Sequence, residues 1–335
     1  MPRSLHPSEP RATRRACLQA ALLSSLAWRP AGAAEAQAWP TRPVRLVVGF
    51  PGGSSPDLTA RTLAEPLARA LGQPVVVENR VGAGGNIGAD AVAKATDGHT
   101  LGLMINGNMT IARLVNPRAP YDPLTELLPV SLVGVSPLVL AAPLQSPGAD
   151  ARAFLEAARA AGDRWSYGSP GIGTVGHIGM EMLKARTGIA PVHVPYPGYP
   201  QVANALLAGD LQLSMLPPAL AAAQVRAGKL RAVAVTAAGR SVLAPDVPSL
   251  AEAGVGDFSL EIWNAVAAPA AMPRPVAARL SALVGEIVRT PEIRAKLRQQ
   301  GWQAVGTSAE GLANRIAADT RAMGRVIAAQ RIRAD

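Results

Sequence analysis

Four short segments combine glycine with neutral hydrogen-bonding side chains, and each follows an apolar run that predicts a strand. They are Phe50–Ser55, Asn79–Gly88, Asn106–Asn108 and Gly168–Thr174. In open α/β sheets, ligands bind at the carboxyl ends of the strands. Glycine allows the backbone to approach a ligand closely, and the N-terminus of a helix that follows such a loop favours anions. The pattern predicts a site for a small carboxylate held by neutral donors; the competing interpretation is that these glycines only form tight turns.

Neutral polar side chains in these segments can hydrogen-bond a ligand. They are Ser54, Ser55, Asn106, Asn108, Ser169 and Thr174. Thr174 also stands where a helix is predicted to begin, and His177 falls in the first turn of that helix. A histidine at this position can contact the ligand or cap the helix at the surface, and the sequence leaves both open.

Catalytic and metal-binding patterns are not recognisable in this chain. The segment Tyr167–Gly171 around Ser169 lacks the first glycine of a nucleophile elbow. His99, His177 and His193 do not have the spacing of metal ligands, and no pair of carboxylates stands out as acid and base. We therefore expect no catalytic residue, no metal and no cofactor.

One alternative function from another class remains open. Gly82–Gly88 follows a predicted strand and enters a predicted helix, as a dinucleotide-binding loop does. However, its third glycine comes one position late, and the next predicted strand ends at Asn106 without an acidic residue for a ribose. The alternative is an exported nicotinamide- or flavin-dependent oxidoreductase that uses this loop.

The elements that position these loops alternate between strand and helix. Val44–Val48, Val75–Val77 and Leu101–Ile105 are predicted strands, with helices between them. The same alternation of loop, helix and strand starts again at Asp150. Such a rhythm is typical of parallel sheets with right-handed crossovers.

Two long apolar runs predict strands that leave one sheet and enter another: Val130–Ala142 and Leu260–Ala267. We therefore predict an α/β fold with two lobes, each a mainly parallel sheet flanked by helices, joined by two hinge strands around a cleft. We expect residues 1–38 to form an export signal, residues 39–136 and 262–335 to form one lobe, and residues 137–261 to form the other.

The composition excludes several classes of protein. Of 335 residues, 49% are apolar, 4% are aromatic and 17% are charged, which is unlike a disordered chain, a coiled coil or a collagen repeat. One cysteine excludes a disulfide framework. The net charge is +10, but the basic residues of 274–335 are spread at helical spacing without interleaved aromatics. We expect a solvated surface there and no nucleic-acid partner.

The first 38 residues have the pattern of an export signal. Arginines, including Arg14 and Arg15, precede the apolar run Ala16–Trp28, which is too short to span a membrane. A small-residue motif ends at Ala38, where we expect cleavage. The arginine pair resembles a twin-arginine signal, and the ordinary secretory route is the alternative. We expect a periplasmic protein.

Eight further motifs point to a known family. They are Trp39–Arg45, Gly72–Arg80, Gly82–Gly88, Tyr121–Leu124, Tyr167–Ser169, Val192–Tyr196, Ala227–Arg231 and Pro245–Pro248. With these motifs, nearly the whole chain after residue 38 resembles the periplasmic solute-binding receptors of tripartite tricarboxylate transporters, the Bug receptors.

The resemblance implies a two-lobed periplasmic binding protein of type II-like fold, a Venus flytrap that closes on one solute. That solute would be a di- or tricarboxylate, an acidic amino acid or a related organic acid. The receptor would be a non-catalytic monomer that delivers the solute to a membrane permease or sensor. Together with His177 and with Tyr196 of the Val192–Tyr196 motif, the implied ligand-binding residues are Gly52, Gly53, Ser54, Asp57, Gly84, Gly85, Asn106, Ser169, Gly173 and Thr174.

Two departures from the family pattern bear on the ligand. The first loop has Pro56 before Asp57, where relatives usually have no proline. Leu216 and Pro217 stand where many relatives have Asp-Asn. The second change removes polarity near the expected cleft, so a relative's ligand does not transfer directly.

Overall fold

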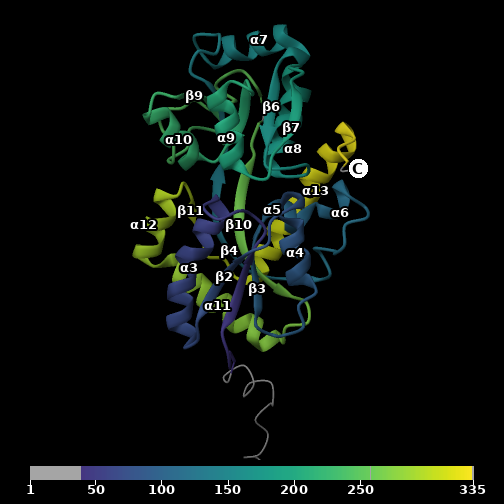
Figure 1. The fold of residues 1–335 in the computed structure, drawn as a ribbon, viewed down its shortest axis with the longest axis vertical. Coiled ribbons are helices and arrows are strands. Elements are labelled where there is room, and N and C mark those ends of the chain that lie inside the picture. Colours follow the sequence, from purple (N-terminus) through teal and green to yellow (C-terminus); the bar gives the residue numbers. More distant parts are fainter. Residues whose placement is uncertain (1–38, 257, 334–335) are drawn as a thin grey trace, which may run out of the picture. The chain divides into compact units, whose positions relative to one another are not determined.

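The computed structural model describes residues 39–256 and 258–333. The expected export signal, including Arg14, Arg15, Cys17 and the cleavage site after Ala38, lies outside the described residues. The chain from Pro40 onward folds as one unit, and the architecture is that of this unit. Figure 1 shows two groups of helices and strands within it, one above the other.

The larger sheet has six strands within the described chain, in the spatial order β11-β4-β10-β3-β1-β2. The strands are β1 (Val44–Val48), β2 (Val75–Asn79), β3 (Thr100–Ile105), β4 (Leu127–Pro137), β10 (Glu261–Pro269) and β11 (Gln303–Ala304). The helices that accompany this sheet are α3 (Ser55–Leu71), α4 (Asn86–Ala93), α5 (Asn106–Thr110), α6 (Ala112–Val115), α11 (Arg274–Arg289), α12 (Pro291–Gln299) and α13 (Ala309–Gln330), with the 3-10 turn η1 (Ala83–Gly85).

The second sheet has five strands in the described chain, in the order β7-β6-β8-β5-β9. The strands are β5 (Val139–Pro143), β6 (Ser166–Ser169), β7 (Val192–Pro195), β8 (Leu213–Leu216) and β9 (Leu230–Val235). Its helices are α7 (Ala151–Ala161), α8 (Val175–Thr187), α9 (Tyr199–Ala208) and α10 (Pro218–Arg226), with the turn η2 (Gly162–Arg164). We call the parts built on the two sheets the first and the second lobe.

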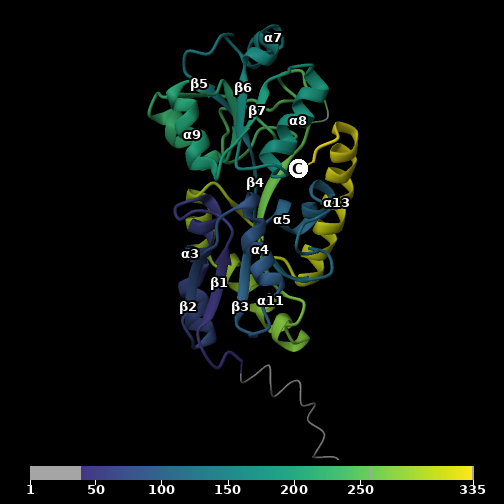
Figure 2. The ribbon, with the colours of Figure 1, turned by 45° about the vertical axis from the view of Figure 1, so that its right-hand side comes forward.

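Two paired strands connect the lobes. β4 and β10 are antiparallel along their whole length, from Leu127 opposite Pro269 to Pro137 opposite Glu261. β5 begins in the other sheet only two residues after β4 ends. Figure 2 shows β4 rising toward the second lobe. The two connecting strands expected from the apolar runs are therefore confirmed, while the lobe boundaries at residues 136 and 261 stay a prediction.

Both sheets are mixed, which corrects the expectation of mainly parallel sheets. β1 is parallel to β2 and β3, but β10 is antiparallel to β3 and β4. In the second sheet β6 is parallel to β7 and β8, but β5 is antiparallel to β8 and β9. The cause is the connection itself, because strands that carry the chain out of a lobe and back must run in opposite directions.

The helix α3 shows how the sequence places the first loop. Its side with Leu63, Leu67 and Leu71 is buried, as the spacing predicts, whereas Leu58 is exposed. Pro56 at the helix start fits there because the first turn needs no N–H partner. Gly72 ends the helix at φ +70°, a left-handed conformation that glycine adopts without strain. The N-terminus of α3 is thereby fixed directly after the glycine loop.

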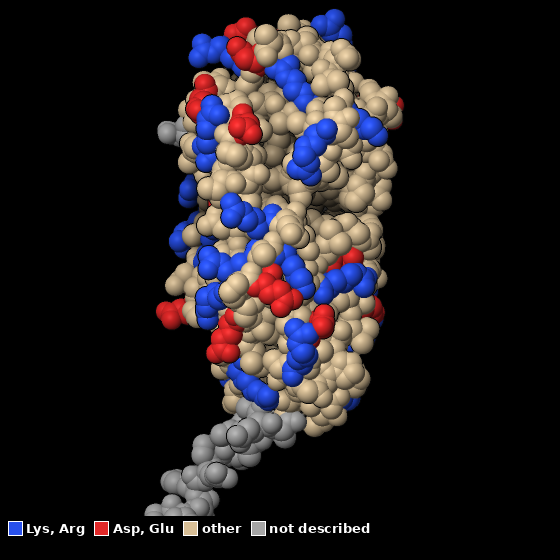
Figure 3. Space-filling model, turned by 90° about the vertical axis from the view of Figure 1, so that its left-hand side faces the viewer, with Lys and Arg blue, Asp and Glu red and all other residues tan. Residues whose placement is uncertain are grey.

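Charged side chains are spread over the surface. Figure 3 shows Lys and Arg distributed over one face with Asp and Glu among them, and a hollow at mid-height whose rim is largely uncharged. Within the described residues, no helix is both long and apolar enough to cross a membrane.

The buried indole of Trp263 ties β10 to α13, and this contact gives a test of the fold. Its Nε1 donates to Asp319 Oδ2 at 2.6 Å, and Asp319 also pairs with Arg315. Trp263→Phe keeps a buried ring but removes a hydrogen bond to a charged group, a loss of about 1.5–3 kcal/mol. We expect the free energy of unfolding in urea to fall by at least that amount.

Trp302→Phe is the matched control. The Trp302 indole is also buried, but its Nε1 donates to the neutral hydroxyl of Ser55 at 3.1 Å. A neutral hydrogen bond contributes about 0.5–1.5 kcal/mol, so this variant should lose less stability. An equal or larger loss for Trp302→Phe would contradict the role assigned to Trp263.

Candidate ligand-binding site

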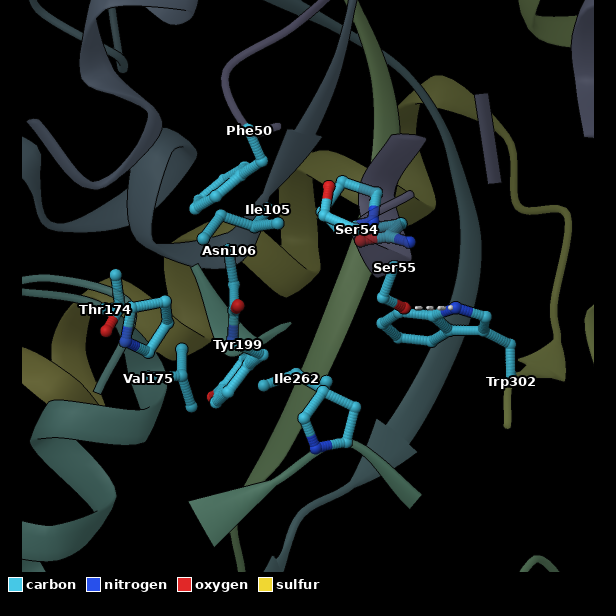
Figure 4. A pocket seen from close by; sticks show the side chains of 14 residues that line it. Phe50, Ser54, Ser55, Ile105, Asn106, Thr174, Val175, Tyr199, Ile262 and Trp302 are labelled. Carbon is cyan, nitrogen blue, oxygen red and sulfur yellow. Dashed lines mark hydrogen bonds between the residues drawn. The ribbon is translucent and has the colours of Figure 1, made fainter. Parts of the chain in front are cut away.

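The starts of several helices meet at a cavity next to the connecting strands, which we call the apolar cavity. Its volume is about 490 Å³, including the part open to solvent. Its polar lining residues are Ser54, Ser55, Asn106, Thr174, Tyr199 and Asn264. Figure 4 shows most of these with the apolar side chains Phe50, Ile105, Val175, Ile262 and Trp302. No Asp, Glu, Lys or Arg is among the lining residues.

Four helix N-termini lie at the apolar cavity, and no charged side chain lines it. α3 starts at Ser55, α8 at Val175 and α9 at Tyr199, and all three residues line the cavity. α10 starts directly after Pro217, which also lines it. The N–H groups of a helix's first turn have no partner inside the helix, and the helix dipole favours an anion there. The cavity therefore suits a carboxylate.

Ser54 is a lining residue whose buried hydroxyl has no hydrogen-bond partner among the described residues. It occupies the N-cap position of α3, but its side chain makes no capping hydrogen bond. The residue is 4% exposed, and Oγ has no partner within the described part of the chain. Such a hydroxyl at a helix N-terminus can donate to a bound carboxylate.

Asp57 supports the first loop. Its Oδ2 accepts from the Gly53 N–H and from Arg61 Nε, both at 2.9 Å, and Oδ1 accepts from Asn79 Nδ2 at 2.9 Å. Burial alone raises the pKa of the Asp57 carboxyl, but hydrogen bonds from Arg61, Gly53 and Asn79 outweigh it and keep that pKa below its ordinary value. The ionised carboxylate fixes the loop that carries Ser54. Gly52, Gly53 and Asp57 are not among the cavity lining.

The loop of the second lobe is held by hydrogen bonds of its own. Ser169 is fully buried; its Oγ lies 2.7 Å from His193 Nε2 and 3.1 Å from the Gly171 carbonyl oxygen. The Thr174 hydroxyl donates to the same Gly171 oxygen at 2.7 Å, and the Gly173 N–H donates to His177 Nδ1 at 3.2 Å. Of these residues only Thr174 lines the apolar cavity. Val175, the first residue of α8, also lines the cavity, so the second lobe places the start of this helix at the cavity.

Two histidines stack beneath this loop. The rings of His177 and His193 are 4.2 Å apart between centroids and tilted by 13°, and Tyr167 stacks on His193 at 4.8 Å. The Tyr167 hydroxyl donates to Glu181 Oε1 at 2.7 Å. Burial, then repulsion from His177, lowers the pKa of His193 to about 4, and burial also lowers the pKa of His177. Both rings are therefore neutral near pH 7 and fit a structural role.

The remaining predicted residues border a second, more polar hollow of about 1,090 Å³, the glycine pocket. Gly84, Gly173 and Tyr196 line it, together with Asn86 and Asn108. The two lobes approach closely here, because a Cβ on Gly171 would lie 3.2 Å from Gly84 Cα. Glycine is required for that contact.

Gly85 and Gly88, which belong to the loop of the oxidoreductase alternative, have a packing role. A Cβ on Gly85 would lie 2.6 Å from the Phe50 ring, and one on Gly88 would lie 2.7 Å from Gly49 Cα. These glycines let the start of α4 pack against the end of β1. Among the described residues, no cluster of three or more His, Cys, Asp or Glu could hold a metal ion.

The predicted residues thus fall into three groups. Ser54, Asn106 and Thr174 line the apolar cavity, and Gly84, Gly173 and Tyr196 line the glycine pocket. Lining neither, but adjoining residues that do, are Gly52, Gly53, Asp57, Gly85, Ser169 and His177. Their role as ligand-binding residues stays a prediction.

Several cavity residues were missed from the sequence. Asn264 and Ile262 lie inside the apolar run Leu260–Ala267. Tyr199 comes after the Val192–Tyr196 motif and does not belong to it, and Trp302 is far along the chain. An Asn inside a strand of otherwise apolar residues was the one available signal, because a buried amide needs hydrogen-bond partners.

Two lobes, each a mixed sheet flanked by helices, with a cavity where they are joined by two strands, define a two-lobed periplasmic binding protein. Comparison with solved structures agrees. The periplasmic binding protein BugD is 30% identical, with a TM-score of 0.82 over 88% of this chain and 99% of that one. R. palustris Rpa4515 with adipate is 31% identical, with a TM-score of 0.83 over 87% and 98% of the two chains. MatC from Rhodopseudomonas palustris with bound malate is 30% identical, with a TM-score of 0.81 over 86% and 100%.

The family follows from the sequence match. Residues 59–332 match the model of the tripartite tricarboxylate transporter family receptor. The chain belongs to this family, which confirms the resemblance to the Bug receptors.

The histidine stack predicts how stability depends on pH. Because the folded-state pKa of His193 is lowered, its contribution to stability is fully present above pH 6.5, the ordinary pKa of histidine. As the pH falls from 6.5 to about 4, the unfolded chain binds a proton that the folded chain does not, so the free energy of unfolding decreases.

Urea unfolding at a series of pH values checks this. His177 stays titratable in His193→Gln, so the difference between the two curves reports the His193 imidazole together with its repulsion of His177. We expect the curve of His193→Gln to be flatter between pH 6.5 and 4. The same slope in both proteins would show that His193 is not held neutral by the fold.

Proposed function

We propose that this protein is a periplasmic receptor that binds a small carboxylate in the apolar cavity by closure of its lobes. One observation carries the proposal: four helices of nine or more residues begin at a cavity without charged lining side chains. Backbone N–H groups and helix dipoles are sufficient to hold an anion in such a place. The structures of Rpa4515 with adipate and of MatC with malate support the same class of ligand.

We further propose that the loaded receptor acts as a monomer and delivers its solute to a membrane transporter. The family description, a receptor of tripartite tricarboxylate transporters, supports this partner. The family and the solved relatives are solute-binding receptors rather than enzymes, which favours this function over the oxidoreductase alternative.

Export is part of the proposal. Residues 1–38 would direct the chain to the periplasm and be removed after Ala38, so the recovered protein should begin at Trp39. Amino-terminal sequencing of protein from a periplasmic extract checks this. A protein that still begins at Met1 in that extract would contradict it.

Ser54→Ala tests the binding site. Mass spectrometry of small molecules released from natively purified protein identifies the carboxylate, and calorimetry measures its affinity. A hydrogen bond to a charged group contributes about 1.5–3 kcal/mol, so loss of the Ser54 hydroxyl should weaken binding roughly ten- to a hundredfold. Stability without ligand should hardly change, because this side chain makes no capping bond.

Ser308→Ala is the matched control. Ser308 is also a helix N-cap, but its side chain accepts from the Gly311 N–H at 3.1 Å and it does not line the cavity. This variant should lose about 1 kcal/mol of stability and keep its affinity. If Ser54→Ala binds as the parent does, the carboxylate is not held at the start of α3.

A further inference from the structure

Two buried amides in the wall of the apolar cavity have orientations fixed by their neighbours. Asn106 Nδ2 donates to the Glu261 carbonyl oxygen at 3.1 Å, and a carbonyl oxygen can only accept. Asn264 Nδ2 donates to Thr59 Oγ1 at 3.0 Å. The Thr59 hydroxyl in turn donates its proton to the Ser55 carbonyl oxygen at 3.0 Å, so toward Asn264 it can only accept. One N–H of each amide is therefore committed to the protein, and this contact fixes which end of the amide is the oxygen.

The side-chain oxygen of each amide has no hydrogen bond to the described residues. Asn106 and Asn264 are both fully buried, and neither Oδ1 atom has a hydrogen-bond partner within the described part of the chain. Both residues line the apolar cavity, and they come from neighbouring positions, since Asn264 pairs with Ile105 in the sheet. A buried acceptor without a partner costs about 1–3 kcal/mol, so a ligand that supplies a donor gains affinity here.

A second carboxylate cannot be that donor. An ionised carboxylate only accepts hydrogen bonds, and it would place its charge against two amide oxygens. An ammonium group would donate, but no Asp or Glu lines the cavity to balance it, and the four helix N-termini oppose a cation. An uncharged N–H or O–H group donates a hydrogen bond and brings no charge that the cavity would have to balance.

The apolar side chains of the cavity wall indicate the chemistry of the middle part of the ligand. Phe50, Ile105, Val175, Ile262 and Trp302 present apolar surface in the same cavity. This surface suits a hydrocarbon body.

We propose that the ligand is an apolar monocarboxylate whose other end carries an uncharged hydrogen-bond donor, an amide or a hydroxyl. Asn106 and Asn264 are the residues that select this end. The inference rests on the proposed function, since it assumes that a carboxylate occupies the helix starts of the same cavity.

Three series of compounds on the unaltered protein test the proposal. The first is the straight-chain dicarboxylates from succinate to suberate, the second their monoamides, and the third the monocarboxylates in which an isopropyl group replaces the amide. At each length the three compounds have nearly the same shape, and their variable ends carry acceptors only, a donor together with an acceptor, or neither. We expect calorimetry to show a monoamide that binds at least tenfold more tightly than both partners of its length.

The outcomes separate this proposal from the proposed function. If dicarboxylates or isopropyl compounds bind as well as the monoamides at every length, the requirement for a donor is overturned, while carboxylate binding stands. If no compound of any series binds, the carboxylate site itself is contradicted.

A pair of variants assigns the selectivity to Asn264. Asn264→Leu keeps the side-chain size but removes the oxygen, so the preference for the monoamide over the isopropyl compound should disappear. Thr59→Ser keeps the hydroxyl that fixes the Asn264 amide, so in this variant the preference should persist. Loss of the preference in Thr59→Ser but not in Asn264→Leu would overturn the assignment. If Asn264→Leu does not fold, the three series on the parent still decide the proposal.

Discussion

The pairing of β4 with β10 is the constraint on which the rest of the structure depends. Because these strands stay hydrogen-bonded from Leu127 to Pro137, the chain leaves the first lobe and returns to it at one place. On its other side β10 pairs with β3, which brings Asn264 beside Ile105, so these parts of β3 and β10 form one wall of the apolar cavity. Both lobes must then meet at that wall, and any motion between them is limited to bending of two adjacent strands.

The proposed recognition at this cavity uses the backbone rather than charged side chains. Helix N-termini from both lobes lie at the cavity, and buried groups outside the cavity keep the loops in place. Asp57 holds the first loop through the Gly53 N–H, and Ser169 with His193 holds the loop of the second lobe. A site of this kind is preorganised, so little free energy is lost in ordering it around a ligand.

Strand and helix periodicity predicted the two lobes and the connecting strands, because long apolar runs such as Leu260–Ala267 have few other uses in a chain of this kind. It did not predict sheet direction, which depends on how strands pair across the lobes. Local loop chemistry predicted Ser54 and Asn106, which lie at strand ends. Loop chemistry could not distinguish these two residues from Asp57 and Ser169, whose polar side-chain atoms form hydrogen bonds within the protein. It also could not identify Trp302, which reaches the cavity only through tertiary packing.

The most direct test of the account is a crystal structure of the protein with the carboxylate that copurifies with it. The account predicts that the carboxylate lies in the apolar cavity, with an oxygen within hydrogen-bond distance of Ser54 Oγ and of N–H groups in the first turn of α3 or α8. A ligand bound instead in the glycine pocket, or a carboxylate paired with an Arg or Lys side chain outside the apolar cavity, would contradict it.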